Sequence, residues 1–452
     1  MESRGWIPSL PFHSPISNIQ YPISIFQSPI SVFLLTLPAW LPLLLDPGLI
    51  NTRAGGDSPF LLQRVYEMSV ALQGGHFPAR WMPDAAFGFG YPFWNYYAPL
   101  AFYVAAAFHL AGLGFVNAIK LTQILGFLGA GAGMYLLADD IFDSRPAAVL
   151  AATAYTYAPF HLVNVYVRGD SLGEFVAFAF YPLIFLGLRR LRARPGPGPA
   201  ALTAAAYAGL ILSHNISALI FTPFAIVYAC LLHVSRFARR PEWRPEPVEG
   251  LVEGVHVSRP ALSHRRHLLW TAAALVVGLA LSGFYWAPAL LEQDAVQLAG
   301  NLTGYFHYAG HFRSTNLIQP NLLFNFAVDA AGTPFAMGLI QAILSLAGFL
   351  IIIALSVFHN SQRTTHNAQL TIDNSQLTID NSSFFAAAAL LATFLITPWS
   401  RPLWDHLPLL PFVQFPWRWL SVQAFGLSVV IGGLAGFLNL NRFRTGRHKH
   451  AI

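Results

Sequence analysis

The chain has 452 residues, of which 55% are hydrophobic and only 10% are charged, and its mean hydropathy is +0.50. Soluble domains carry about 25% charged residues, so this composition excludes an ordinary soluble enzyme and predicts an all-α polytopic membrane protein. The basic residues behind the net charge of +6 are dispersed between apolar runs, which argues against a nucleic-acid partner, and the single cysteine, Cys230, excludes a disulfide framework.

Apolar runs near the length needed to cross a bilayer recur along the chain, since a helix of about 20 apolar residues spans about 30 Å of hydrocarbon. They predict about ten transmembrane helices in a single domain, 30–438, which follows a low-complexity segment, 1–29, and precedes a basic tail, 439–452. The runs lie near residues 30–46, 116–137, 147–163, 175–190, 199–213, 216–235, 267–290, 333–358, 384–398 and 418–438.

A further run, Tyr96 to Gly114, is also long enough to cross, but the distribution of Lys and Arg argues against it. If this run does not cross, most of the 26 basic residues fall on the side of the termini, including those near 189–194, 236–240, 265–266 and 442–449. Cytoplasmic loops carry an excess of Lys and Arg. We therefore expect a protein of the cytoplasmic (inner) membrane with both termini in the cytoplasm and a long outer loop, 47–115, that carries interfacial helices.

The start of this outer loop contains a helix signal and a candidate site residue. Asp57 or Ser58 can cap a helix that has Pro59 at its first position and ends at Gly74-Gly75. Asp57 also follows a flexible stretch, Ala54-Gly55-Gly56, directly beyond the first span, which lets its carboxylate point back toward the membrane surface. Both capping and a catalytic role are open for Asp57.

The second outer loop places Arg168, Asp170 and Glu174 between two apolar helices. Ser171 followed by Glu174 is a capping-box pattern, which would give these residues a purely structural role. Placing charged residues at the membrane end of a helix bundle costs free energy unless they form ion pairs or take part in function. A catalytic or binding role is therefore the second interpretation. Together with Asp57, the carboxylates of this loop could hold Mg²⁺ or Mn²⁺, which prefer oxygen ligands.

Three further polar residues are candidate substrate-binding groups. Arg418 lies at the outer end of the last predicted span, beside Trp417, and Arg313 lies in an outer loop. A guanidinium at this depth can bind a lipid phosphate through two hydrogen bonds, although interfacial anchoring is the simpler role. His214, in the turn between two predicted spans, is either part of a polar turn or lines a cavity.

Two predicted cytoplasmic insertions, 236–266 and 359–383, contain low-complexity sequence to which we assign no catalytic role. The second holds two copies of a seven-residue repeat, 367–373 and 374–380, with too few apolar positions for a coiled coil. The chain also lacks the GxxxxGK[ST], HExxH and GxSxG motifs, which argues against energy coupling at a nucleotide site and against a zinc helix or a nucleophile elbow.

Several of these motifs together resemble the bacterial membrane proteins labelled "6-pyruvoyl-tetrahydropterin synthase-related domain". The resemblance rests on Gly56-Asp57, the run from Gly75 to Asp84, Gly88 to Pro92, Tyr166 to Glu174 with Pro182, and Gln414 to Arg418. The label implies little about pterins, because the spaced zinc-binding histidines of the soluble synthase have no counterpart here. The architecture is similar to the GT-C superfamily of glycosyltransferases and to YfhO-type membrane proteins.

The GT-C resemblance implies a function and a set of roles. By position, Asp57 and either Asp170 or Glu174 correspond to the outer-loop acids that act as base or bind metal in GT-C enzymes. Because the second-loop acids are four residues apart here, metal dependence stays open. The implied activity is transfer of a sugar from a polyprenyl-phosphate carrier to an outer-face acceptor. The alternative is a lipid-linked-glycan transporter or a non-catalytic membrane scaffold.

Overall fold

The computed structural model describes residues 29–50, 58–169, 171–233, 260–297, 300, 302–328, 332–365 and 374–444. Across these residues the chain is helical, and the strand-like pairings are two isolated bridges, Met82 with Tyr91 and Ile318 with Met337. The predicted all-α class is therefore confirmed.

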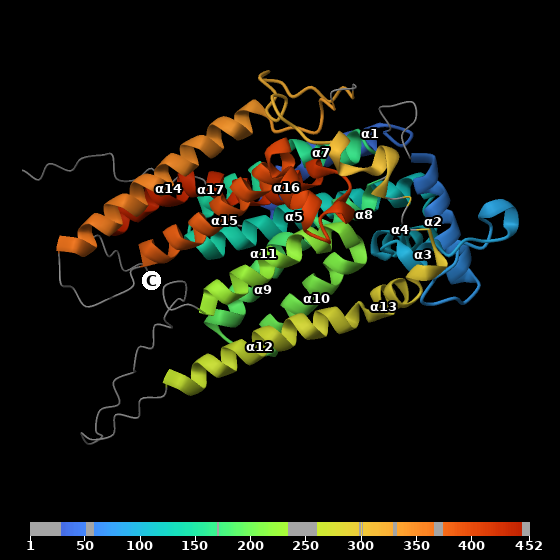
Figure 1. Ribbon diagram of the computed structural model, residues 1–452, viewed down its shortest axis with the longest axis horizontal. Helices are drawn as coiled ribbons and strands as arrows, with labels where there is room; N and C mark the ends of the chain where they lie inside the picture. Colours follow the sequence, from blue (N-terminus) through green and yellow to red (C-terminus); the bar gives the residue numbers. More distant parts are fainter. Residues whose placement is uncertain are drawn as a thin grey trace, which may run out of the picture.

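Long helices run side by side in a bundle, and a group of shorter helices, α2 to α4, lies across one of its ends (Figure 1). We call this end the α2 end. The bundle contains α1 (Pro29–Leu45), α5 (Phe115–Phe142), α6 (Arg145–Thr156), α7 (Pro159–Tyr166), α8 (Leu172–Ala177), α9 (Phe180–Ala193), α10 (Pro197–Ser213), α11 (Asn215–His233), α12 (Pro260–Leu281), α13 (Gly283–Leu291), α14 (Leu339–Thr365), α15 (Asn374–Ile396) and α17 (Leu420–Arg444). The shorter elements include α2 (Ser58–Gln73), α3 (Phe93–Tyr96), α4 (Leu100–Leu110), α16 (Arg401–His406) and the 3₁₀-helix η10 (Pro416–Trp419).

Six helical segments of the described chain are long and apolar enough to cross a membrane, and the bent pair α12–α13, with a 67° bend, gives a seventh. The predicted count of ten spans therefore stays a prediction. The helix α4, within the disputed run Tyr96 to Gly114, has 11 residues. Such a helix rises about 16 Å, which is too short to cross the hydrocarbon layer.

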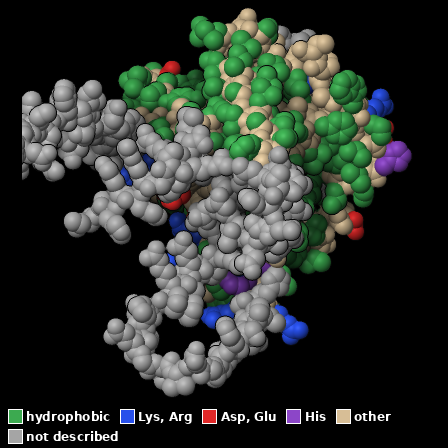
Figure 2. Space-filling model, turned by 90° about the vertical axis from the view of Figure 1, so that its left-hand side faces the viewer, with side chains coloured by type: hydrophobic (Ala, Val, Ile, Leu, Met, Phe, Trp, Pro, Cys, Tyr) green, Lys and Arg blue, Asp and Glu red, His purple; other side chains and the backbone are tan. Residues whose placement is uncertain are grey.

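In Figure 2, hydrophobic side chains cover most of the upper part of the molecule. On α14, Ile343, Leu346, Leu350 and Ile353 are each between 56% and 60% exposed and share one helix face. A soluble protein would bury such a stripe, so it marks a surface that contacts lipid.

Small residues on α5 bring α8 and α9 into close contact with it. A Cβ atom at Gly126 would lie 2.5 Å from the Phe175 ring, and one at Gly133 would lie 2.8 Å from Pro182. Close helix contacts at small residues are a typical means of association in membranes. The contact fixes the position of α8, which carries Glu174.

The α2 to α4 segment has a hydrophobic core of its own, and that core continues into the bundle. Val65 and Met68 of α2 are fully buried with Phe102 of α4, and the same cluster includes Ile119 of α5 and Leu172 at the start of α8. The segment therefore lies directly over the end of the bundle where α8 begins.

The helix α15 begins earlier than expected, at Asn374, and α14 extends to Thr365. Residues 359–383, predicted as a cytoplasmic insertion, are thus partly continuous with the helices that flank them. Ile379 and Asn381 are buried, at 3% and 1% exposure. The sequence pattern did not indicate this helix, because residues 374–383 are mostly polar. Asn381 and Ser382 are buried with hydrogen bonds to Arg189 and to the Thr378 carbonyl.

Arg189 forms a buried polar network at the end of the bundle opposite the α2 end. Its Nε donates to Asp140 Oδ1 at 2.5 Å, and its Nη1 donates to Asn381 Oδ1 at 2.9 Å and to the Tyr228 hydroxyl at 3.3 Å. Tyr228 in turn donates to Asn381 Oδ1 at 2.6 Å. This network joins α5, α9, α11 and α15.

Arg189→Met is expected to lower the free energy of unfolding by about 3 kcal/mol, because Asp140, which is 28% exposed, loses its ion pair and the buried Asn381 and Tyr228 lose a charged donor. Reversible unfolding of the purified chain in mixed micelles measures this loss. The matched control is Arg190→Met in the exposed neighbouring position. Equal stability of the two variants would contradict the assigned role of the network.

Candidate polar site at the α2 end

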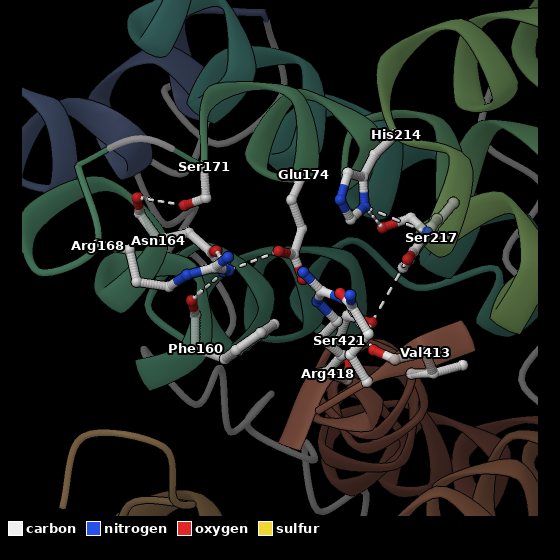
Figure 3. A network of polar contacts seen from close by, with 12 residues as sticks. Phe160, Asn164, Arg168, Ser171, Glu174, His214, Ser217, Val413, Arg418 and Ser421 are labelled. Atoms are coloured by element: carbon white, nitrogen blue, oxygen red, sulfur yellow. Dashed lines mark hydrogen bonds and ion pairs between the residues drawn. The ribbon is translucent and has the colours of Figure 1, made fainter. Parts of the chain in front are cut away.

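A second buried polar cluster is centred on Glu174 in the first turn of α8. The Glu174 side chain is 2% exposed, and its Oε2 lies 2.5 Å from Arg168 Nη1 in an ion pair. Figure 3 shows Arg168, His214 and Arg418 arranged around the Glu174 carboxylate. Each of these three residues interacts electrostatically with Glu174. Three distant segments, 164–174, 213–217 and 413–421, thus meet at one carboxylate.

The predicted capping box at Ser171 and Glu174 is not formed. The Ser171 side chain makes no cap hydrogen bond to α8, and its hydroxyl donates instead to the Asn164 carbonyl at 2.8 Å. The Asn164 side chain accepts a 2.5 Å hydrogen bond from Arg168 Nη1 and donates to the Phe160 carbonyl at 2.8 Å. The ion pair with Arg168 is a stronger interaction for a buried carboxylate than a backbone cap, so Glu174 turns toward the arginine.

His214 approaches Glu174 because α8 and the end of α10 lie very close together. A Cβ atom at Gly173 would lie only 2.5 Å from the Ser213 carbonyl oxygen, so only glycine permits this approach. His214 is 7% exposed, and its Nδ1 is 2.8 Å from the Ser217 hydroxyl. The structure therefore places His214 inside the cluster rather than in a solvated turn.

Arg418 is held by the backbone turn that precedes it. Its Nη1 donates to the Val413 carbonyl at 2.8 Å and to Gln414 Oε1 at 3.1 Å, and the side chain is 8% exposed. Gln414 has a φ of 64°, a conformation that is uncommon outside glycine and costs free energy. Strain of this kind is found where a side chain must be placed accurately, and here it helps to fix the guanidinium.

Arg313 lies beside the cluster rather than in it. Its Nε donates to the Phe335 carbonyl at 3.3 Å, and its guanidinium lies 5.8 Å from the centre of the Phe335 ring. Phe335 stacks on Trp417, at 4.2 Å between ring centres. Arg313 is thus joined to the site through aromatic rings.

Asp57 and Asp170, the other two predicted acids, lie outside the described residues. The described surroundings of Glu174 do not fit a divalent cation, since two guanidinium groups face its carboxylate and would repel the ion. In the described ranges no group of three or more His, Cys, Asp or Glu side chains could hold a metal. The set of donors around Glu174 fits an anion instead.

An ion pair ties the α2 to α4 segment to the bent helix α13. Arg80 Nη2 lies 2.6 Å from Glu292 Oε1, and Asn95 donates to Glu292 Oε2 at 2.7 Å. These hydrogen bonds lower the pKa of the Glu292 carboxyl. The α2 to α4 segment, which covers this end of the bundle, is therefore attached both to α13 and to the core that includes α5 and α8.

An apolar groove of about 270 Å³ lies between α6, α14 and the loop before α14. Its walls include Tyr157, Phe324, Leu344 and Ile431, and Pro159 at the start of α7 closes one side. The next residue, Phe160, contacts Trp417, at 6.1 Å between ring centres, and accepts the hydrogen bond from Asn164. The helix α7 thus contributes residues both to the groove and to the polar cluster.

Sequence reasoning singled out Arg168, Glu174, His214 and Arg418, which the structure brings together, but missed Asn164, Ser217 and Trp417 as their partners. Asn164 precedes Arg168 by four residues, a spacing that brings side chains together on a helix and could have been used. Trp417 was seen only as an interfacial anchor. Its contact with Arg168 joins segments far apart in the chain, so no local pattern signals it.

Residues 94–242 match the family described as "6-pyruvoyl-tetrahydropterin synthase related domain; membrane protein". This match confirms the predicted resemblance for the part of the chain that carries Arg168, Glu174 and His214. A protein of Lactococcus lactis subsp. cremoris (strain MG1363), described as uncharacterized, is 25% identical over 190 residues, which are 41% of this chain and 31% of that protein.

Two solved structures are also similar. They are the Archaeoglobus fulgidus oligosaccharyltransferase in the apo form and the same organism's AglB in complex with an inhibitory peptide and a dolichol-phosphate. Each aligns with 96% of this chain, at TM-scores of 0.44 and 0.43 and identities of 13% and 15%. The chain spans 53% of each of these structures and 31% of the Lactococcus lactis protein.

Proposed function

We propose that this chain is a membrane glycosyltransferase of GT-C type that moves a sugar from a polyprenyl-phosphate carrier to an acceptor at the α2 end of the bundle, which we assign to the outer face of the cytoplasmic membrane. The observation that carries the proposal is the convergence of Arg168, His214 and Arg418 on Glu174 in a buried site. Guanidinium groups in such a site bind phosphate oxygens strongly.

The proposed reaction is a displacement at the anomeric carbon. An acceptor oxygen forms a bond to this carbon, the bond from the carbon to the phosphate oxygen breaks, and the electron pair leaves with the polyprenyl phosphate. Negative charge therefore grows on the phosphate, where Arg168 and Arg418 stabilise it. The acceptor's proton passes to a carboxylate, the role that we assign to Asp57 with Asp170 as the alternative.

Glu174 has a different role in this proposal from the catalytic one that its position in the sequence suggested. Its carboxylate is engaged by Arg168 at 2.5 Å and is buried from solvent. A base must reach the proton that it removes, so an ion-paired carboxylate is poorly suited to that task. Glu174 instead positions the two arginines.

The apolar groove beside α7 supports a donor that arrives from the bilayer. It shares α7 with the polar cluster and is lined by hydrophobic side chains of α6, α14 and α17. Lipid-linked donors need both an apolar surface and a phosphate site. The alternative function, a lipid-linked-glycan transporter, is favoured by one observation, the 67° bend between α12 and α13, because transporters use broken helices.

The test is a transfer assay with the full chain in phospholipid vesicles that contain a radiolabelled polyprenyl-phosphate sugar. Transfer of the label from the lipid to an acceptor that occurs only when the wild-type protein is present supports the enzymatic function. The matched control is the Arg168→Gln, Arg418→Gln double variant, which should be inactive. Label that stays on the lipid but changes leaflet at a wild-type-dependent rate would instead establish the transporter and overturn the proposal.

A further inference from the structure

Three aromatic rings near the polar cluster form a stack centred on Trp417. The Trp417 ring lies nearly parallel to Phe335, at 4.2 Å and 20°, and to Phe415, at 5.0 Å and 22°. Phe160 meets it edge-on, at 6.1 Å and 60°. Trp417 is 6% exposed, so the stack is held in place from several sides.

Both arginines of the cluster lie over this stack. The Arg168 guanidinium carbon is 5.0 Å from the centre of the Trp417 ring. The Arg418 guanidinium carbon is 4.9 Å from the Phe415 ring and 5.9 Å from the Trp417 ring. A cation over an aromatic face within about 6 Å is attracted by the ring, most strongly by tryptophan and when the pair is desolvated.

Trp417 is the one ring in contact with both guanidinium groups in the described part of the chain. Glu174 attracts the same two arginines from another side. The other partners described above hold one guanidinium each, Asn164 for Arg168 and the Val413–Gln414 turn for Arg418, so they do not set the two groups relative to each other. A flat indole ring restricts their relative freedom, because each planar guanidinium packs against a surface.

We propose that Trp417 is a positioning residue that sets the spacing and orientation of Arg168 and Arg418 for a phosphate group. The inference rests on the proposed function, because it assumes that these arginines bind the phosphate of the donor. Trp417 itself does not contact the reacting atoms. Its effect reaches the donor through the two guanidinium groups.

The substitution Trp417→Leu tests this role, with Trp419→Leu as the matched control. Trp419 lies in the same 3₁₀-helix and is 5% exposed, and its ring contacts Phe224 at 6.1 Å rather than an arginine. Both substitutions remove a buried indole. They therefore carry a similar cost in packing and differ in what they do to the arginines.

The readout is the affinity of the protein in nanodiscs for farnesyl phosphate, relative to its affinity for farnesol. The two ligands have the same hydrocarbon tail and differ only in the phosphate group. Wild type should prefer farnesyl phosphate. Trp417→Leu should lose about tenfold of this preference, while Trp419→Leu and the conservative Trp417→Phe should largely keep it. A loss of packing alone would weaken the binding of both compounds equally and leave the ratio of their affinities unchanged.

The outcomes separate the two proposals. A wild-type chain without preference for the phosphate overturns the proposed function and this inference with it. A wild-type preference that persists in Trp417→Leu overturns the inference alone. Unfolding midpoints of all four proteins, measured in the same nanodiscs, identify a variant that has failed to fold. If Trp417→Leu fails, Trp417→Met takes its place as a second non-aromatic substitution, with the same tenfold loss expected and the same persistence of the preference overturning the inference.

Discussion

Arg418→Gln is expected to slow sugar transfer by about 100-fold, because removing one donor that stabilises the charge developing in a transition state has an effect of this order. The phosphate gains negative charge only as its bond to the sugar breaks. The loss should therefore fall mainly on kcat, with a smaller change in the KM for the donor. Steady-state transfer with a polyprenyl-phosphate sugar measures both quantities.

Arg418→Lys separates the charge from its geometry. Lysine keeps the positive charge but lacks the planar, two-pronged donor, and it cannot donate to Val413 and to a phosphate in the same way. We expect an activity between those of wild type and Arg418→Gln. The matched control is Arg401→Gln in the same loop, where the arginine side chain is 61% exposed. A wild-type kcat in Arg418→Gln would remove Arg418 from the mechanism.

Glu174→Gln is expected to lower the free energy of unfolding by about 3 kcal/mol, because Arg168, only 16% exposed, would lose its carboxylate partner. Glutamine has nearly the same shape, so packing at the start of α8 is preserved and the change isolates the charge. Unfolding in mixed micelles, followed by tryptophan fluorescence, measures the difference from wild type.

A double-mutant cycle with Arg168→Gln shows whether the loss belongs to the ion pair. The double variant should be less destabilised than the sum of the two single variants, since neither charge is then left alone. Glu292→Gln provides the control, because its ion pair with Arg80 is 47% exposed at both partners and should contribute little. Additive effects of Glu174→Gln and Arg168→Gln would show that the pair does not couple.

Much of the fold could be predicted because apolar length and charge distribution act over short stretches of sequence. The helix α2 follows from Ser58, Pro59 and the glycines after Gln73, and the helix expected within Tyr96 to Gly114 is present as α4. The breaks within spans were not predicted. The run 147–163 forms two helices, because the backbone leaves the helical conformation at Ala158 without a change in hydrophobicity. The run 175–190 lies in one candidate span, Leu172–Ala193, since Phe178 and Ala179 between α8 and α9 keep helical dihedral angles.

For the site, the sequence indicated individual charged residues but not the contacts between them. Arg168, Glu174 and Arg418 were recognisable, since charges at the lip of an apolar bundle need a reason. Their partners depend on which segments meet in space. The contact of Gly173 with Ser213 brings His214 to Glu174, and the stack on Trp417 joins residues 160, 335 and 415. Contacts between segments so far apart in the chain leave no periodic pattern in the sequence.

The segment Leu172–Ala193, which contains α8 and α9, is held by an ion pair near each of its ends. Glu174 is fastened to Arg168 at one end and Arg189 to Asp140 at the other, about 22 Å apart along a helix. These two ion pairs oppose both sliding of the segment along its axis and rotation about it. Under the proposed function, the movements that admit a donor are therefore expected in the α2 to α4 segment, while the Glu174 carboxylate keeps its position.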